Sequence, residues 1–476
     1  MKQMKCFYSR RFFECCCLLT VFAIEFVFGS SDLGPDPEVT LNAGTVVGAW
    51  RKSPSGSRYR QFLRLPYAKP PIGELRFKDN LKPVLVFVHG GGYRSGVSAS
   101  FYYNPLHLMD TGDIVVVSFN YRLNLFGFFT LGDDAAPGNL AVRDSLALLQ
   151  WVQKEIRFFG GDPKRVTVAG HSAGGAIASY LMYAPEAAGL FHALILLSGN
   201  ILCPWAMQST NTAEASQRVL ESVGCHGGKS SDDIVECLQS VKVVVLQKAE
   251  EALERKGPLL PFYWTPSVDS GTSTPMFPQR ITKDTPLVNK VPLMMGVTRD
   301  DGVVTAFSHL ATKNYLNKLN STWDEECADY LLFGDFADSQ DAKRRCDAIR
   351  AEYFGPDDGQ ISFDQGFDFI SLLRDQLFGI CSADIASNAL KFAPVYAYSF
   401  EHVPVDNSFL KLFLGSRVKA TDQIAPEFDG SVHGSDVTTL FRLFILDFTR
   451  KPVDSALMSR VRSNFISRVV NFVKTG

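Results

Sequence analysis

The stretch Arg165-Val-Thr-Val-Ala-Gly-His-Ser-Ala-Gly-Gly175 decides the fold. It opens with a short apolar run typical of a buried strand, and the small residues after Ser172 favour a helix. Between them the sequence reads glycine-histidine-serine-alanine-glycine. Strand, sharp turn and helix in that order expose a serine hydroxyl above the edge of a sheet, and the two glycines let strand and helix approach closely. We therefore expect Ser172 to be a nucleophile on such a turn.

Outward from this turn, short apolar runs alternate with helical segments. Six runs are predicted strands: Val84–Val88, Ile114–Phe119, Arg165–Ala169, Ala193–Ser198, Pro292–Val297 and Val395–Phe400. Short, continuously apolar runs are typical of strands buried on both faces of a parallel sheet. Residues 145–159 have apolar positions at helical spacing between the second and third runs. This alternation predicts an α/β architecture, with helical insertions around the sheet edge over residues 210–256 and 310–375.

Composition sets limits on the kind of protein. The chain has 476 residues, of which 46% are hydrophobic and 21% charged, and its net charge is −2. The near-neutral balance and the lack of a basic stripe give no reason to expect a nucleic-acid partner. Beyond the N-terminal segment no apolar run reaches about eighteen residues, so we expect no membrane span. We expect neither a metal nor a cofactor, because no cluster has metal-ligand spacing.

The N-terminal segment has the layout of a secretory signal peptide. Basic residues between positions 2 and 11 precede the apolar run 15–24, and Val27-Phe-Gly29 offers small residues for cleavage. We predict a signal peptide over residues 1–29 and a secreted protein; the alternatives are a short buried helix or a start site assigned too early. No repeat or change in composition marks a boundary afterwards, so residues 30–476 are predicted to form one domain.

The cysteines and one sequon fit a secreted chain. Of ten cysteines, four precede residue 30, and an even number remains. Cys225 and Cys237 flank a short glycine-containing loop and are a predicted disulfide, with isolated buried thiols as the alternative. Asn320-Ser-Thr is the one glycosylation sequon, expected on a loop.

A serine nucleophile needs a base, and the base needs an orienting acid. With this type of turn the chain order is serine, acid, histidine. His433 lies in Gly430-Ser-Val-His-Gly-Ser-Asp436, whose glycines and serines suit a loop that places an imidazole in a site. For the acid, Asp300 and Asp301 follow a predicted strand, and at most one of two adjacent residues can orient the histidine. Composition does not choose between them.

The sequence also offers an oxyanion hole. His89-Gly-Gly-Gly92 follows the first predicted strand, and successive glycines present backbone N–H groups to a cavity. Each such donor contributes about 2.7–4 kcal/mol to stabilising a tetrahedral intermediate. The N–H of Ala173 would complete the set.

With these motifs the chain resembles the type-B carboxylesterases, the cholinesterase-like family of α/β-hydrolases. The matching stretches are 62–77, 86–96, 120–139, 159–175, 266–269, 296–302 and 430–436. The resemblance implies an α/β-hydrolase fold, with a mostly parallel central sheet flanked by helices. It further implies a serine esterase that forms an acyl-enzyme. Its pattern selects Asp301 as the acid beside Ser172 and His433, and Gly91, Gly92 and Ala173 as oxyanion donors.

The same resemblance bears on the substrate, which we expect to be a small-molecule ester. Cholinesterases have a glutamate before the nucleophile, where this chain has His171. A general carboxylesterase is therefore favoured over a cholinesterase. The family also includes adhesion proteins without the nucleophile, so a non-catalytic binding protein is the second hypothesis. The filled serine, acid and histidine positions argue against it.

The chain departs from the family at two places. Residues 78–83 join two family blocks directly, where relatives carry several tens of residues, including a strand of the sheet. An absent interior strand predicts a gap in the sheet with unpaired backbone groups. Relatives also continue beyond the position of Gly476, which leaves Cys381 without its family partner and therefore expected unpaired. Two hypotheses are open: an alternatively spliced or otherwise altered form of an active esterase, which we favour, or a true variant that folds differently or not at all.

Overall fold

The structure is a computed structural model. It describes residues 35–41, 44–63, 81–207, 209–227, 230–253, 262–310, 313–333, 339–355, 360–402, 430–442 and 456–476. The predicted signal peptide 1–29 and most of the first family block lie outside these residues. The chain divides into two compact units, residues 1–77 and 78–476. In the first unit two antiparallel pairs form, β1 (Glu38–Leu41) with β2 (Gly44–Val47) and β3 (Ala49–Lys52) with β4 (Arg58–Gln61).

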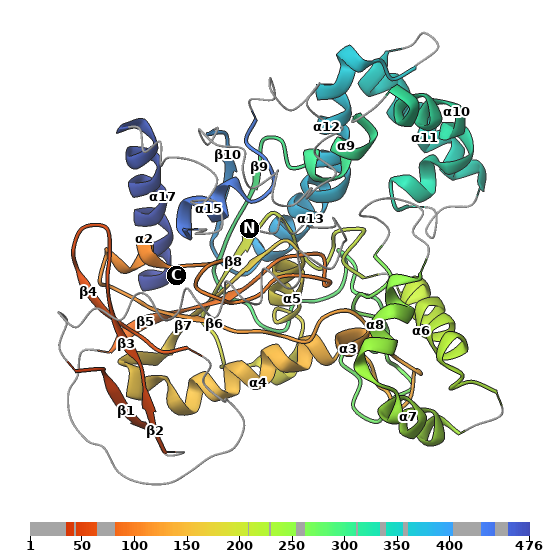
Figure 1. Ribbon diagram of the computed structural model, residues 1–476. Coiled ribbons are helices and arrows are strands. Elements are labelled where there is room, and N and C mark those ends of the chain that lie inside the picture. Colours follow the sequence, from red (N-terminus) through yellow and green to blue (C-terminus); the bar gives the residue numbers. More distant parts are fainter. Residues whose placement is uncertain are drawn as a thin grey trace, which may run out of the picture. The chain divides into compact units, whose positions relative to one another are not determined.

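The second unit is built on a six-stranded sheet (Figure 1). Its strands are β5 (Lys82–Val88), β6 (Val115–Ser118), β7 (Gly161–His171), β8 (Ala193–Leu197), β9 (Leu293–Thr298) and β10 (Val395–Phe400). Their order is β10-β9-β8-β7-β5-β6, and every neighbouring pair is parallel. The six predicted strands and the α/β architecture are therefore confirmed.

The expected gap in this sheet is wrong for the strands that the structure describes. β5 begins at Lys82, within the junction at 78–83, and pairs with β7 on one side and β6 on the other. Leu85, for example, lies opposite Val116 and Thr167. The described order runs without interruption from β10 to β6, so the missing family segment leaves no unpaired row between these strands.

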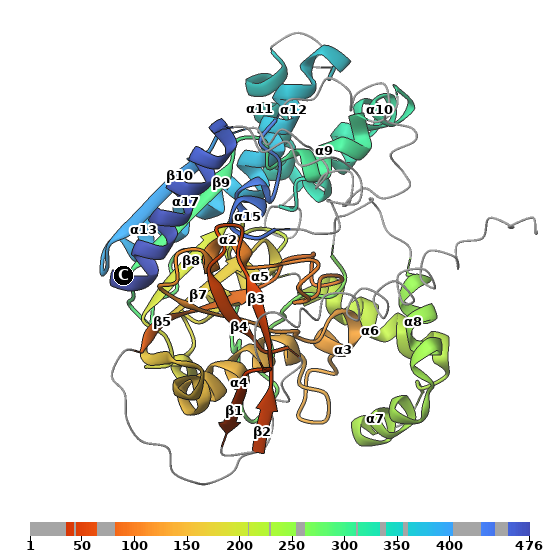
Figure 2. The same ribbon diagram turned by 60° about the vertical axis from the view of Figure 1, so that its left-hand side comes forward.

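Helices cover both faces of the sheet, as the continuously apolar strands require. One core packs Val84, Val86 and Val88 of β5 with α4 (Leu140–Glu155) and α5 (Ala173–Tyr180). The other packs Leu85 and Phe87 with α2 (Leu106–Met109), α15 (Ser435–Leu440) and α17 (Ala456–Thr475). Alternate residues of β5 thus pack against opposite helical layers, and these helices lie on either side of the sheet (Figures 1 and 2).

The remaining helical elements connect these layers or form the insertions. They are α3 (Asn124–Phe128), η2 (Ile156–Phe159), η3 (Pro185–Ala187), α6 (Ser209–Val223), α7 (Ser231–Ser240), α8 (Val243–Glu251), α9 (Val303–Leu310), α10 (Lys313–Tyr330), α11 (Ser339–Phe354), η5 (Phe363–Gln365), α12 (Gly366–Arg374), η6 (Asp375–Gly379) and α13 (Ile380–Ala389). Both predicted insertions are helical: α6–α8 form one group and α9–α12 another (Figure 2). No helix in the described ranges is long and apolar enough to cross a membrane.

Three disulfides lie in the described part of the second unit. Cys225–Cys237 is the pair expected from the sequence, and Cys327–Cys346 links α10 to α11. The expectation that Cys381 is unpaired is wrong. Its Cα on α13 lies 4.8 Å from that of Cys203, in the loop after β8, and the two form a disulfide. Both cysteines are buried.

Candidate active site

The turn at Ser172 has the geometry that its sequence predicts. β7 ends at His171, α5 begins at Ala173, and Ser172 between them has φ 56° and ψ −124°. A non-glycine residue in this strained region is found mainly at functional sites. The flanking glycines are required by contact: a Cβ at Gly170 would lie 2.2 Å from the Gly174 carbonyl oxygen. The N–H of Ser172 donates to the Leu197 carbonyl on β8, which fixes the turn against the sheet.

The glycine-rich loop after β5 lies against this turn. Val88, the last residue of β5, pairs with Gly170 of β7, so both strands end at the same edge. A Cβ at Gly90 would lie 3.0 Å from the Cβ of Ser172. Gly91 and Gly92 have φ of 124° and 61°, values that glycine adopts without strain. The loop therefore runs past Ser172 with backbone, not side chains, facing it.

Asp301 and His433 form the second part of the site. The Nδ1–H of His433 donates to Oδ1 of Asp301 at 2.7 Å, and both side chains are buried. Oδ2 of Asp301 accepts the N–H of Thr298, the last residue of β9. With Nδ1 carrying the proton, Nε2 of His433 is left as the acceptor. The Asp301 carboxylate thus reaches the imidazole directly.

Asp300 has a different task from Asp301. Its Oδ2 accepts the N–H of Ser431 at 2.8 Å, and its own N–H donates to the Ser431 carbonyl. Burial raises the pKa of the Asp300 carboxyl, and Arg299, which donates to the same oxygen, opposes that shift. Asp300 therefore fixes the backbone of Ser431, two residues before His433, while Asp301 binds the imidazole.

Two aromatic rings contact His433. The ring of His171, the residue before the nucleophile, lies 4.7 Å away between centroids, and that of Phe378, on η6, lies 4.9 Å away. His171 is fully desolvated, which holds its pKa well below the usual value, with further lowering from His433 and His89. Burial likewise lowers the pKa of His89 to about 4. Both histidines are therefore uncharged at neutral pH.

A further buried acid lies close to the pair. Asp436, three residues after His433, accepts the hydroxyl of Tyr398 on β10 at 2.7 Å. Desolvation is the main cause that raises its pKa to about 6, and the Tyr398 bond opposes it. Tyr398 fits here because Gly296 of β9 has no side chain; a Cβ there would lie 2.4 Å from the tyrosine ring.

The structure thus brings Asp301 together with His433, and the loop of Gly90 together with Ser172. Within the described residues no hydrogen bond joins Ser172 to His433; such bonds are often long before substrate binds. Asn320 lies in α10 and not on a loop, and its amide donates to and accepts from the backbone of Ile361. In the same described ranges, no group of three or more His, Cys, Asp or Glu is placed to hold a metal ion.

The sequence missed Phe378, Tyr398 and the part played by Asp300. Phe378 belongs to no motif, and its place depends on a π-helical turn that periodicity does not reveal. Asp436 stood within the quoted histidine motif. Its acidic side chain three residues after His433 was the one available signal.

A parallel sheet with helices on both faces, a serine on a strained strand-to-helix turn, and an Asp–His pair at the same edge define an α/β-hydrolase. Comparison with known proteins places it more closely. A sequence model of the Carboxylesterase family matches residues 35–82 and 78–476. The chain belongs to this family. The two matches overlap at 78–82, where the resemblance predicts that a family segment is missing.

Curated relatives and a solved structure agree with this placement. Esterase FE4 of Myzus persicae is 28% identical over 445 residues, covering 81% of this chain and 77% of its own. Juvenile hormone esterase of Tribolium castaneum is 28% identical over 501 residues, covering 90% and 82%. The crystal structure of juvenile hormone esterase from Manduca sexta superposes with a TM-score of 0.72 over 93% of this chain and 90% of that one, at 23% identity. The last comparison supports the fold.

Proposed function

We propose that this enzyme, a carboxylic ester hydrolase by its family, acts through Ser172, His433 and Asp301 as a serine esterase. The observation that carries the proposal is the buried 2.7 Å hydrogen bond from His433 to Asp301, at the sheet edge where Ser172 lies on its strained turn. Such a pair leaves Nε2 of the histidine free to accept a proton from a serine hydroxyl.

The first half of the reaction acylates the serine. Oγ of Ser172 attacks the ester carbonyl carbon, and Nε2 of His433 accepts the hydroxyl proton. The carbonyl oxygen becomes an oxyanion, which accepts hydrogen bonds from the N–H groups of Gly91, Gly92 and Ala173. The tetrahedral intermediate then expels the alkoxide, which leaves as the alcohol with the proton from His433.

Water completes the turnover. His433 removes a proton from the water, whose oxygen attacks the acyl carbon to give a second tetrahedral intermediate. As this intermediate collapses, His433 returns the proton to Oγ of Ser172 and the acid is released. Throughout, Asp301 keeps the imidazole in one tautomer and stabilises the imidazolium that forms in each half. Its carboxylate suits that role because the Thr298 N–H already occupies the other oxygen.

We propose neutral esters as the substrate class. His171 stands next to the nucleophile and is uncharged, so the site presents no anion there to attract a cationic alcohol such as choline. The names of the relatives, an esterase and a juvenile hormone esterase, fit this class. A strong preference of the purified enzyme for choline esters over neutral short-chain esters would contradict it.

The test is covalent labelling with a fluorophosphonate, followed by mass spectrometry of the modified peptide. We expect one label, on Ser172, that is lost in Ser172→Ala and in His433→Ala. The second loss matters because it shows that the serine depends on the histidine. A soluble, monodisperse wild-type protein that takes no label would refute the proposal and favour the non-catalytic binding protein.

We further propose that the protein is secreted. The disulfides favour an oxidising compartment, since such bonds are rare in the cytosol. Expression in a secreting eukaryotic cell should release a mature chain that begins near residue 30. Retention of residues 1–29 in an intracellular product would contradict this proposal.

A further inference from the structure

The hydrogen bond to Asp301 restrains the imidazole of His433 at its Nδ1 edge. A single bond at Nδ1 leaves the imidazole free to tilt about the line from Nδ1 to Oδ1. Nε2 lies on the far side of the ring, so a small tilt moves it relative to the Ser172 hydroxyl. Contacts on the two faces of the imidazole must therefore restrain the tilt that the bond to the carboxylate allows.

One of these contacts is the ring of His171. Its centroid lies 4.7 Å from that of His433, and neither of its ring nitrogens has a hydrogen-bond partner among the described residues. A buried imidazole without partners pays a desolvation cost that hydrogen bonding does not recover. It therefore acts here through its ring face. Gly90 makes room for it, because a Cβ at that residue would lie 2.8 Å from Nδ1 of His171.

The other contact is Phe378, which comes from an irregular helical turn. η6 is a π-helical turn between α12 and α13, and such turns are frequent at functional sites. It places Phe378 4.9 Å from the ring of His433 and leaves the side chain almost fully buried.

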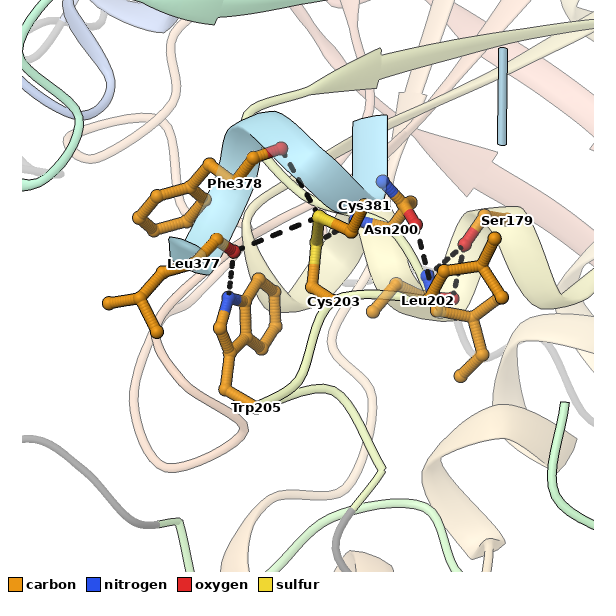
Figure 3. The surroundings of a disulfide bond; sticks show 10 residues. Ser179, Asn200, Leu202, Cys203, Trp205, Leu377, Phe378 and Cys381 are labelled. Atoms are coloured by element: carbon orange, nitrogen blue, oxygen red, sulfur yellow. Dashed lines mark hydrogen bonds between the residues drawn. A yellow bond between two sulfur atoms is a disulfide. The ribbon is translucent and has the colours of Figure 1, made fainter. Parts of the chain in front are cut away.

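Trp205 and a disulfide hold this turn in place (Figure 3). The indole N–H of Trp205 donates to the Leu377 carbonyl at 2.8 Å, and its ring lies 5.9 Å from Phe378. Cys381, three residues after Phe378, is bonded to Cys203, two residues before Trp205. Sγ of Cys381 also lies 3.2 Å from the Phe378 carbonyl oxygen. The loop after β8 is thus joined to η6 by a covalent bond, a hydrogen bond and a ring contact.

We propose that His171 and Phe378 are positioning residues that hold the imidazole of His433 in its reactive orientation, and that the Cys203–Cys381 disulfide and Trp205 set Phe378 against it. This inference rests on the proposed function. It assigns to Cys203–Cys381 a part in turnover in addition to stability. The disulfide lies outside the reacting atoms and acts only through the turn that carries Phe378.

The first test compares two buried phenylalanines. In Phe378→Ala we expect kcat to fall about tenfold to a hundredfold on a neutral nitrophenyl ester, the cost of about 1 Å of misplacement, with KM within about threefold. The rate of fluorophosphonate labelling should fall by the same factor. The matched control is Phe369→Ala on α12, an equally buried ring that contacts Tyr330 and Phe354 instead. It should lower Tm but leave kcat within about twofold.

The second test separates ring contact from other effects of His171. His171→Ala should lower kcat about tenfold, and His171→Phe, which keeps a ring, should restore most of it. For the contacts that hold the turn, Trp205→Phe removes the indole N–H and shortens the ring that packs on Phe378, and Cys203→Ala/Cys381→Ala removes the crosslink. Both changes should lower kcat and leave KM within about threefold of wild type. Cys225→Ala/Cys237→Ala, which removes a disulfide elsewhere, should leave kcat unchanged.

The activity of the wild-type protein tests the proposed function, and the variants test the positioning residues, so the two can fail separately. If the wild type turns over ester and both Phe378→Ala and His171→Ala keep its kcat, the inference is wrong. Equal losses in Phe378→Ala and Phe369→Ala would also overturn it, because they would reflect a general loss of packing. If Phe378→Ala does not fold, Phe378→Leu and Trp205→Phe test the same ring contact with a smaller loss of side-chain volume, and each should still lower kcat.

Discussion

Replacing either of two adjacent carboxylates by its amide tests the site most directly. Asp301→Asn and Asp300→Asn are the same chemical change one residue apart. Oδ2 of Asp301 accepts the N–H of Thr298 and Oδ1 accepts the N–H of His433, so both oxygens are committed. An asparagine has one oxygen for these two donors. One of the two contacts must therefore become unfavourable.

The outcome depends on whether the backbone N–H of Thr298 or the Nδ1–H of His433 keeps the single amide oxygen of Asp301→Asn. If the backbone N–H of Thr298 keeps it, the amide NH₂ faces Nδ1 of His433. Nδ1 must then accept, the proton moves to Nε2, and the imidazole can no longer take a proton from Ser172. In the flipped orientation the buried Thr298 N–H loses its partner, at about 1–3 kcal/mol of stability. The wrong tautomer costs about 10⁴-fold in kcat, or ~5 kcal/mol of transition-state stabilisation.

Asp300→Asn should cost far less. Asparagine keeps an oxygen for the Ser431 N–H, and what is lost is the charge toward Arg299, whose side chain is 38% exposed. A pair with a partly exposed partner contributes about 1 kcal/mol or less. We expect kcat/KM within about tenfold of wild type. The assay is steady-state hydrolysis of a neutral nitrophenyl ester, with thermal unfolding to verify the fold. Equal losses in the two variants, or a folded Asp301→Asn within tenfold of wild type, would refute this account of the site.

Three other predictions follow from local geometry. Gly90→Ala should lower fluorophosphonate labelling about a hundredfold, because its Cβ would press to 3.0 Å from that of Ser172; labelling at the wild-type rate would contradict this. Burial raises the pKa of Asp436 from 3.8 to about 6, so the folded state binds the carboxyl proton more tightly than the unfolded state does. The stability that this proton contributes to the folded state is therefore present below pH 4 and is lost as the pH rises to about 6. Relative to Asp436→Asn, the wild type should therefore lose about 2–3 kcal/mol of unfolding free energy between pH 4 and 6 in denaturant titrations, whereas parallel curves would contradict the shift. Glycosylation of Asn320 remains a prediction from the sequon. Asn320→Ala should lower Tm by breaking the part-buried backbone bridge to Ile361. Thr322→Ala removes the sequon and only exposed hydrogen bonds to Lys318 and Glu326, so it should change the Tm of unglycosylated protein much less.

Features local in sequence could be predicted. The strands were visible because burial on both faces makes them continuously apolar, and the turn at Ser172 because its glycines are required within a few residues. Chain order together with its glycine- and serine-rich loop supplied His433. The choice of Asp301 over Asp300 needed the family pattern, because two adjacent carboxylates differ in direction and not in composition.

Features that depend on distant contacts could not be predicted. Cys203 and Cys381 are 178 residues apart, and nothing in either neighbourhood marks the other. The contact between Phe378 and His433 needs a π-helical turn, whose extra residue rotates the side chains that follow. The expected gap in the sheet was wrong for a related reason. The pairing of β5 is decided by strands far along the chain and not by what precedes it.

That pairing also bears on whether the chain is an intact enzyme. The residues of the proposed site come from the ends of β5, β7 and β9 and from the loop 430–436. In a parallel sheet these ends share one edge, so the site needs only that β5, β7, β8 and β9 stay in order. The junction at 78–83 ends in the first residues of β5, and β5 still pairs with β7 from Lys82 to Val88. A segment missing there leaves the framework of the site complete, which favours the altered form of an active esterase over an inactive variant.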